Sequence, residues 1–176
     1  MASRIPVSFD PYEYYKLDPA GYDWRLLLNL SGKCRDAVAS PHPCIYVGSE
    51  KSVVPEIAEV VLNMADDSAA RPESARRPAR ITTYFHIALT NPPSTESPRR
   101  FTEAVRLVCL LASRSRPVFV HCVYGTSRSV SVAATAAAML AGADVVDVLI
   151  EMSKQRPEVC PDVAYITMGQ WLNGEL

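Results

Sequence analysis

The chain has 176 residues, of which 48% are hydrophobic and 21% charged, and its formal net charge is −1 at pH 7. This length and balance are typical of one globular domain with a core of its own. A near-neutral charge gives no reason to expect nucleic acid or an anionic membrane surface as a partner.

The cysteines and the apolar runs indicate the cellular compartment and whether the chain binds zinc or spans a membrane. The five cysteines form no C-x-x-C pair, and an odd number cannot all pair within the chain, which favours a reducing compartment and argues against a zinc site. The N-terminal stretch has no apolar core of a signal peptide, and no run approaches the roughly 18–20 apolar residues of a membrane span. We therefore expect a cytoplasmic protein with no membrane span, no metal and no cofactor.

The first half of the chain combines an N-terminal extension with short strands. Residues 1–43 are rich in Tyr, Asp and Pro and contain one predicted helix over 23–30, and we separate them from a domain over residues 44–176. Apolar runs in that domain predict strands at 44–47, at the end of 57–64 and at 81–89. Two prolines and four arginines predict an exposed loop over 68–80.

Helices dominate the second half. Apolar residues three and four positions apart predict an amphipathic helix over 101–112. After a predicted strand at 118–120, residues 129–141 have almost no polar face, so we expect them to form a buried central helix.

Two shorter helices complete the prediction. Gly142 is expected to end the central helix, and Asp144 can cap the next one over 145–155. A final helix is predicted to begin near Pro161. Strands followed by helices around one core indicate an α/β domain, with a central, mostly parallel sheet of four to five strands flanked by helices.

The stretch HCVYGTSRS, residues 121–129, joins a predicted strand to the buried helix. A loop before a helix N-terminus points several backbone N–H groups at one place, and Gly125 tolerates the positive φ that such a loop needs. These groups fit the oxygens of a phosphate, and the planar fork of Arg128 can bind two of them. We therefore predict that the substrate phosphate is bound by Val123, Tyr124, Gly125, Thr126, Ser127 and Arg128.

Cys122, at the start of this loop, is the candidate nucleophile. The loop donors should stabilise its thiolate, which would lie beneath a bound phosphoryl group and in line for attack. Ser129 can hydrogen-bond the sulfur and help it leave in the second step. These residues predict phosphoryl transfer through a phosphocysteine intermediate.

The pattern Cys122-x5-Arg128-Ser129, preceded by His121, resembles the signature of the cysteine-dependent protein tyrosine phosphatase superfamily, and its dual-specificity branch most closely. The resemblance extends over residues 44–174. It implies a phosphatase fold and a phosphoprotein substrate, with phosphoserine and phosphothreonine possible beside phosphotyrosine. It also gives His121 a structural role, as a hydrogen-bonding residue that orients the loop.

The same resemblance implies a general acid, an aspartate on the loop after the third predicted strand. Counting back from Cys122 leads to Asn91, which can hydrogen-bond but cannot donate a proton as an acid. Two substitutes stay open: Glu96, on the stretch over 92–98, and Asp66 or its neighbour Asp67. Alternatively, these carboxylates only cap or solvate their loops.

Two functions therefore remain open on the sequence alone. One is a phosphotyrosine-directed phosphatase that is weak or uses a displaced acid. The other is a catalytically weak or inactive phosphatase-like module that binds phosphoproteins. Intact Cys122, Arg128 and Ser129 favour the enzyme, and Asn91 favours the binding module.

Overall fold

The computed structural model describes residues 39–66, 81 and 83–174. The predicted helix over 23–30, the predicted loop over 68–80 and Asp67 lie outside the described residues. The described elements, in chain order, are β1 (Ala39–His42), β2 (Ile45–Ser49), β3 (Val60–Asn63), β4 (Thr83–His86), α3 (Ser97–Ser113), β5 (Val118–Cys122), α4 (Arg128–Ala141), α5 (Val145–Gln155) and α6 (Val163–Asn173).

The described strands form one sheet in the order β1-β2-β5-β3-β4. Strands β2, β5, β3 and β4 run parallel, whereas β1 pairs antiparallel with β2. Ser49 lies opposite Cys122 in neighbouring strands, and Asn63 lies opposite His121, so the carboxyl ends of these strands meet at one edge. Ligands of α/β proteins bind outside that edge. The predicted α/β class with a mostly parallel sheet is confirmed.

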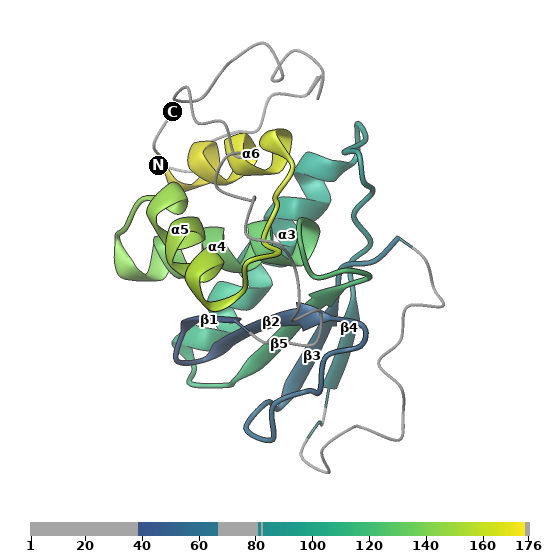
Figure 1. The fold of residues 1–176 in the computed structure, drawn as a ribbon, viewed down its shortest axis with the longest axis vertical. Helices are drawn as coiled ribbons and strands as arrows, with labels where there is room; N and C mark the ends of the chain where they lie inside the picture. Colours follow the sequence, from purple (N-terminus) through teal and green to yellow (C-terminus); the bar gives the residue numbers. More distant parts are fainter. Residues whose placement is uncertain (1–38, 67–80, 82, 175–176) are drawn as a thin grey trace.

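The helices α3, α4, α5 and α6 lie together on one side of the sheet (Figure 1). Helix α4 is buried from its first residue to Ala138 and packs against the other three helices as well as the sheet. Its run of alanines allows the neighbouring helices to approach closely. Gly142 ends it with φ +63°, and the Asp144 carboxylate accepts hydrogen bonds from the first amides of α5, both as predicted.

A small second cluster covers the other face of the sheet. Val61 and Phe119 project from β3 and β5 and pack against Val54 and Ala58, which lie in the segment between β2 and β3. Both central strands are therefore buried on both faces, which explains their continuous apolar sequences.

Two strands differ from the prediction. Strand β1 was not predicted, because Pro41 interrupts a stretch with little apolar character. It is an edge strand, where a missing N–H can be tolerated. Strand β4 is shorter than the predicted run over 81–89, since after His86 the carbonyls of the chain bind side chains from α3, α4 and α6.

His121 is fully buried in β5 and stacks on Phe119, with ring centroids 5.8 Å apart. Neither ring nitrogen has a partner at the usual hydrogen-bond distance and angle within the described part of the chain, although the Cys122 backbone interacts with the ring. Burial lowers the pKa of His121 to about 4, although the backbone of Cys122 has a smaller, opposite effect. The His121 ring therefore packs in the core directly before the loop.

This buried neutral imidazole should make stability depend on pH. The pKa of an unfolded histidine is near 6.5. As the pH falls from 6.5 towards 4, the unfolded state therefore binds a proton at this histidine, whereas the folded state does not. Stability is then complete above about pH 6.5 and is lost progressively towards pH 4. We expect the free energy of unfolding of wild type to fall, relative to His121→Gln, by up to roughly 3 kcal/mol across this window. Urea denaturation of both proteins at several pH values measures this, and parallel pH curves would contradict it.

Candidate active site

The loop after β5 folds around the sulfur of Cys122. The Gly125 amide donates a hydrogen bond to Cys122 Sγ over 3.2 Å, and the Ser129 hydroxyl lies 3.3 Å from the same atom. Gly125 has φ +65°, and a Cβ there would lie 2.4 Å from the carbonyl of Gly48, so only glycine fits. Two donors around a buried sulfur can stabilise a thiolate.

Arg128, the first residue of α4, is brought to the same edge of the sheet as Cys122. Its Nη1 donates to Asp66 Oδ1 over 2.6 Å and to the Leu89 carbonyl over 3.0 Å. The guanidinium is buried, whereas the Asp66 side chain is half exposed. The structure thus places the Ser129 hydroxyl beside the Cys122 sulfur and Arg128 at the same edge of the sheet.

Arg156 supports the loop from behind, a role that sequence reasoning missed. Its side chain is fully buried, and it donates from Nη1 to the Gly125 carbonyl over 2.6 Å and from Nη2 to the Tyr124 carbonyl over 2.9 Å. In a planar trans peptide the C=O and N–H groups point in opposite directions. Binding the Tyr124 carbonyl therefore turns the Gly125 N–H towards Cys122. The only sequence signal was an arginine directly after a helix and before Pro157.

The segment that follows Arg156 continues this support. The Thr126 carbonyl accepts from the Cys160 amide over 2.8 Å, and the Ser127 hydroxyl accepts from the Asp162 amide over 2.9 Å. With the two bonds of Arg156, three consecutive carbonyls of the loop are satisfied on the side away from the sulfur. The amides are thereby left to face a common point, which suits an oxyanion.

Asn91 lies on a loop that is bound to the site. The three carbonyls before it, those of Ala88, Leu89 and Thr90, accept hydrogen bonds from Arg100, Arg128 and Tyr165 over 3.2, 3.0 and 2.5 Å. Burial raises the pKa of Tyr165 to about 12, so its hydroxyl remains a donor at neutral pH. Because Arg128 contacts this loop directly, exposed Asn91 lies on a segment joined to the Cys122 loop.

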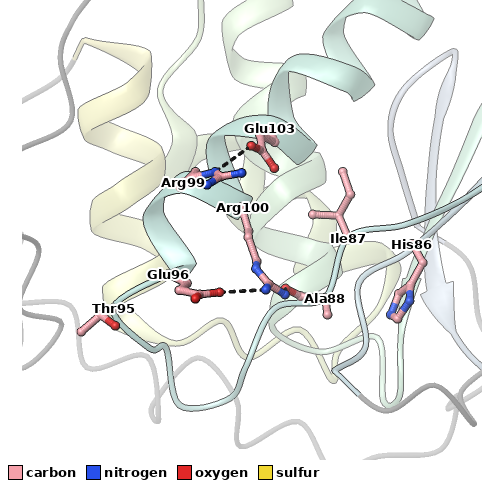
Figure 2. A pocket seen from close by; sticks show the side chains of 8 residues that line it. All are labelled: His86, Ile87, Ala88, Thr95, Glu96, Arg99, Arg100 and Glu103. Carbon is pink, nitrogen blue, oxygen red and sulfur yellow. Dashed lines mark hydrogen bonds and ion pairs between the residues drawn. The ribbon is translucent and has the colours of Figure 1, made fainter. Parts of the chain in front are cut away.

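Glu96 is engaged elsewhere. It precedes α3, and its Oε2 lies 2.7 Å from Arg100 Nη2, with the two side chains pointing towards each other in Figure 2. A second ion pair, Arg99 with Glu103, lies at the same cavity between β4 and α3. Glu96 would have to leave Arg100 before it could donate a proton at the Cys122 loop.

The remaining loop residues divide into exposed and buried ones. The Tyr124 side chain is 67% exposed, and with Val123 and Thr126 it lines a second cavity beside the loop. Lys51 and Glu158 lie in the wall of the same cavity. Ser127 is buried, and its hydroxyl accepts a hydrogen bond from the Asp162 amide, while its predicted contact with a phosphate stays a prediction.

Within the described ranges, no group of three or more His, Cys, Asp or Glu side chains is arranged to hold a metal ion. None of the described helices is long and apolar enough to cross a membrane.

A family model for protein-tyrosine phosphatases matches residues 51–168, which include the Cys122 loop, the Asn91 loop and Arg156. The chain belongs to the protein-tyrosine phosphatase family. No curated protein matches the sequence at a significant level.

Solved structures of this family share the fold. A mouse dual specificity phosphatase complexed with zinc tungstate is similar with a TM-score of 0.65 and 16% identity, over 85% of this chain and 94% of that one. Human DUSP28 is similar with a TM-score of 0.63 and 14% identity, over 79% of this chain and 94% of that one. The human tyrosine phosphatase-like serine/threonine/tyrosine-interacting protein is similar with a TM-score of 0.62 and 14% identity, over 80% of this chain and 97% of that one. The predicted resemblance to the phosphatase superfamily is confirmed.

The support from Arg156 can be tested by Arg156→Met, which keeps much of the buried volume but removes both donors. The carbonyls of Tyr124 and Gly125 would then be buried without these partners. We expect the free energy of unfolding to fall by about 2–4 kcal/mol and the affinity for orthophosphate to fall as well. Chemical denaturation and calorimetry measure the two effects.

Arg116→Met is the matched control, since Arg116 and Glu59 form a half-exposed ion pair. This control should lose less than about 1 kcal/mol and keep its orthophosphate affinity. Equal losses in the two variants would contradict a special role for Arg156.

Proposed function

We propose that this phosphatase-family protein hydrolyses phosphate monoesters on proteins, with phosphotyrosine favoured, through a phosphocysteine intermediate. The observation that carries the proposal is the Cys122 sulfur, held 3.2 Å from the Gly125 amide and 3.3 Å from the Ser129 hydroxyl beside a buried Arg128. A thiolate in such a set of donors is a nucleophile at an oxyanion site.

In the first step, the Cys122 thiolate attacks phosphorus, so that an S–P bond forms and the bond from phosphorus to the ester oxygen breaks. The amides of the loop and the guanidinium of Arg128 stabilise the charge on the other phosphate oxygens. The substrate oxygen leaves with the electron pair and takes up a proton. In the second step, water attacks phosphorus, the S–P bond breaks, and the Ser129 hydroxyl stabilises the departing thiolate. Orthophosphate is released.

The preference for phosphotyrosine follows from Asn91. A positioned general acid contributes roughly 10²–10⁴ in rate, and an asparagine cannot supply it. The carboxylates proposed as substitutes, Asp66 and Glu96, both form ion pairs with arginines. A phenol, with a pKa near 10, leaves as an anion far more easily than a serine or threonine hydroxyl. Phosphoserine and phosphothreonine should therefore be turned over more slowly.

Asn91 also supports a second candidate, a phosphatase-like module that binds phosphoproteins and scarcely turns them over. One structure with the same fold is named as a tyrosine phosphatase-like interacting protein. The two candidates differ in turnover. A binding module would bind a phosphotyrosine peptide tightly and release no orthophosphate from it or from an activated aryl phosphate. The complete set of Cys122, Arg128 and Ser129 favours the enzyme, because binding alone does not require a thiolate.

Substitution of the nucleophile and of the phosphate-binding arginine tests the proposal. Cys122→Ser should abolish release of orthophosphate from an aryl phosphate while leaving orthophosphate binding measurable by calorimetry. Arg128→Lys should reduce kcat/KM by roughly 10²–10³-fold, because a point charge cannot replace the two-donor fork. Substantial turnover by Cys122→Ser would assign the nucleophile to another residue.

Asn91→Asp tests the general-acid position. We expect kcat to rise by up to roughly 10²–10⁴-fold for a phosphotyrosine peptide and less for an activated aryl phosphate, whose leaving group needs no proton. The pH profile should also gain a falling limb at higher pH, as the new carboxylic acid ionises. If wild type already shows that limb, and Glu96→Gln or Asp66→Asn removes it, the acid lies at the substituted carboxylate instead.

A further inference from the structure

Asp66 occupies a position that its surroundings fix. It follows β3, and both the backbone amide and the backbone carbonyl of the residue before it are hydrogen-bonded. The Ala65 amide donates to Asn63 Oδ1 over 2.9 Å, and the Ala65 carbonyl lies 2.6 Å from His86 Nε2. Asn63 is itself buried. The half-exposed Asp66 carboxylate therefore directly follows a residue whose backbone is held on both sides.

The contact with Arg128 uses only one end of the guanidinium. Nη1 carries two hydrogens, and Asp66 Oδ1 and the Leu89 carbonyl accept at 2.6 and 3.0 Å. Within the described ranges, Arg128 makes no other hydrogen bond. Its Nε and Nη2 form the edge that remains, and this edge offers two parallel donors to two phosphate oxygens.

These two acceptors fix the plane of the guanidinium. If it rotated, both bonds of Nη1 would break, and the buried charge would lose the one carboxylate that pairs with it among the described residues. An arginine that is oriented before the substrate arrives loses no further rotational freedom of its side chain when the substrate binds. Asp66 therefore prepares the two-donor edge for the phosphate.

Two other roles for Asp66 fit the contacts less well. A proton donor has to reach the leaving oxygen of the substrate, whereas Asp66 Oδ1 is held 2.6 Å from Arg128 Nη1. A competitor for the phosphate site would have to bind the edge that the phosphate uses. Asp66 binds Nη1, opposite the free Nε.

We propose that Asp66 is a positioning residue that orients Arg128 for bidentate phosphate binding, rather than a substitute general acid. This role rests on the proposed function, because it assumes that the Cys122 loop binds phosphate.

Two substitutions with different remaining acceptors test this role. Asp66→Asn keeps an oxygen that can accept from Nη1, whereas Asp66→Ala removes it. We expect Asp66→Ala to weaken inhibition by orthophosphate roughly ten- to a hundredfold and to lower kcat/KM for an aryl phosphate to a similar extent. Asp66→Asn should stay within about threefold of wild type in both, which is the rescue expected of a positioning contact.

Glu59→Ala is the matched control. Glu59 directly precedes β3 and pairs with Arg116 at the opposite end of the strand, so this variant loses the same charge and leaves the site intact. It should keep wild-type inhibition by orthophosphate. Thermal denaturation establishes that each variant is folded, and Asp66→Ser, whose hydroxyl is too short to reach Nη1, replaces Asp66→Ala if the latter does not fold.

The outcomes separate the alternatives. Tighter orthophosphate binding by both Asp66 variants would show competition and overturn the proposal. If Asp66→Asn and Asp66→Ala lose turnover equally, keep their orthophosphate affinity and lose the alkaline limb of the pH profile, Asp66 is a proton donor. That result would also overturn the proposal. If the wild type binds orthophosphate and neither substitution changes that affinity, Asp66 does not orient Arg128. That result would overturn this proposal and leave the proposed function intact. Wild-type protein that binds no orthophosphate would overturn the proposed function together with this role.

Discussion

The peptide groups of the Cys122 loop are oriented by hydrogen bonds to their carbonyls, and the site depends on this constraint. A planar peptide can aim its N–H at a ligand only if its C=O is satisfied on the other side. Here the buried guanidinium of Arg156 binds two successive carbonyls, and the Cys160 amide binds the third. Helix α5 and the segment after it are thus as necessary to the loop as β5 and α4, which carry its residues.

The two buried arginines of the site share a side-chain type but serve different ends. Arg156 uses its donors on the carbonyls of Tyr124 and Gly125 and lies 3.8 Å from the Glu158 carboxylate. Among the described residues, Arg128 is bound through one nitrogen, by Asp66 and by the Leu89 carbonyl. The first arginine is therefore part of the scaffold, and the second has donors left for the phosphate that we propose it binds. The same contact of Arg128 joins the Asn91 loop to the Cys122 loop, so the residue that we propose at the general-acid position follows a segment held by the site.

Part of the site could be predicted because its chemistry is local in the chain. Cys122, Gly125, Arg128 and Ser129 lie on one loop, so their spacing between a strand and a helix carries the geometry. Helix α4 was also predictable, since a segment with almost no polar face has to be buried. Arg156 was not, because its partners are carbonyls more than thirty residues away along the chain. Strand β1 was missed because pairing with β2, and not its own sequence, makes it a strand.

The sequence by itself determined the α/β class, the strand–loop–helix that surrounds Cys122, and the absence of an aspartate at position 91. These depend on short-range patterns of polarity, glycine and charge, which can be read from residues close together in the sequence. Only the tertiary structure decided which carboxylate meets Arg128, since Asp66 and Glu96 look alike as loop residues. The sheet order places the end of β3 beside β5, which brings Asp66 to the guanidinium, whereas Glu96 at the start of α3 meets Arg100 one helical turn away. Contacts between distant segments follow from the packing of strands and helices, and no local pattern encodes them.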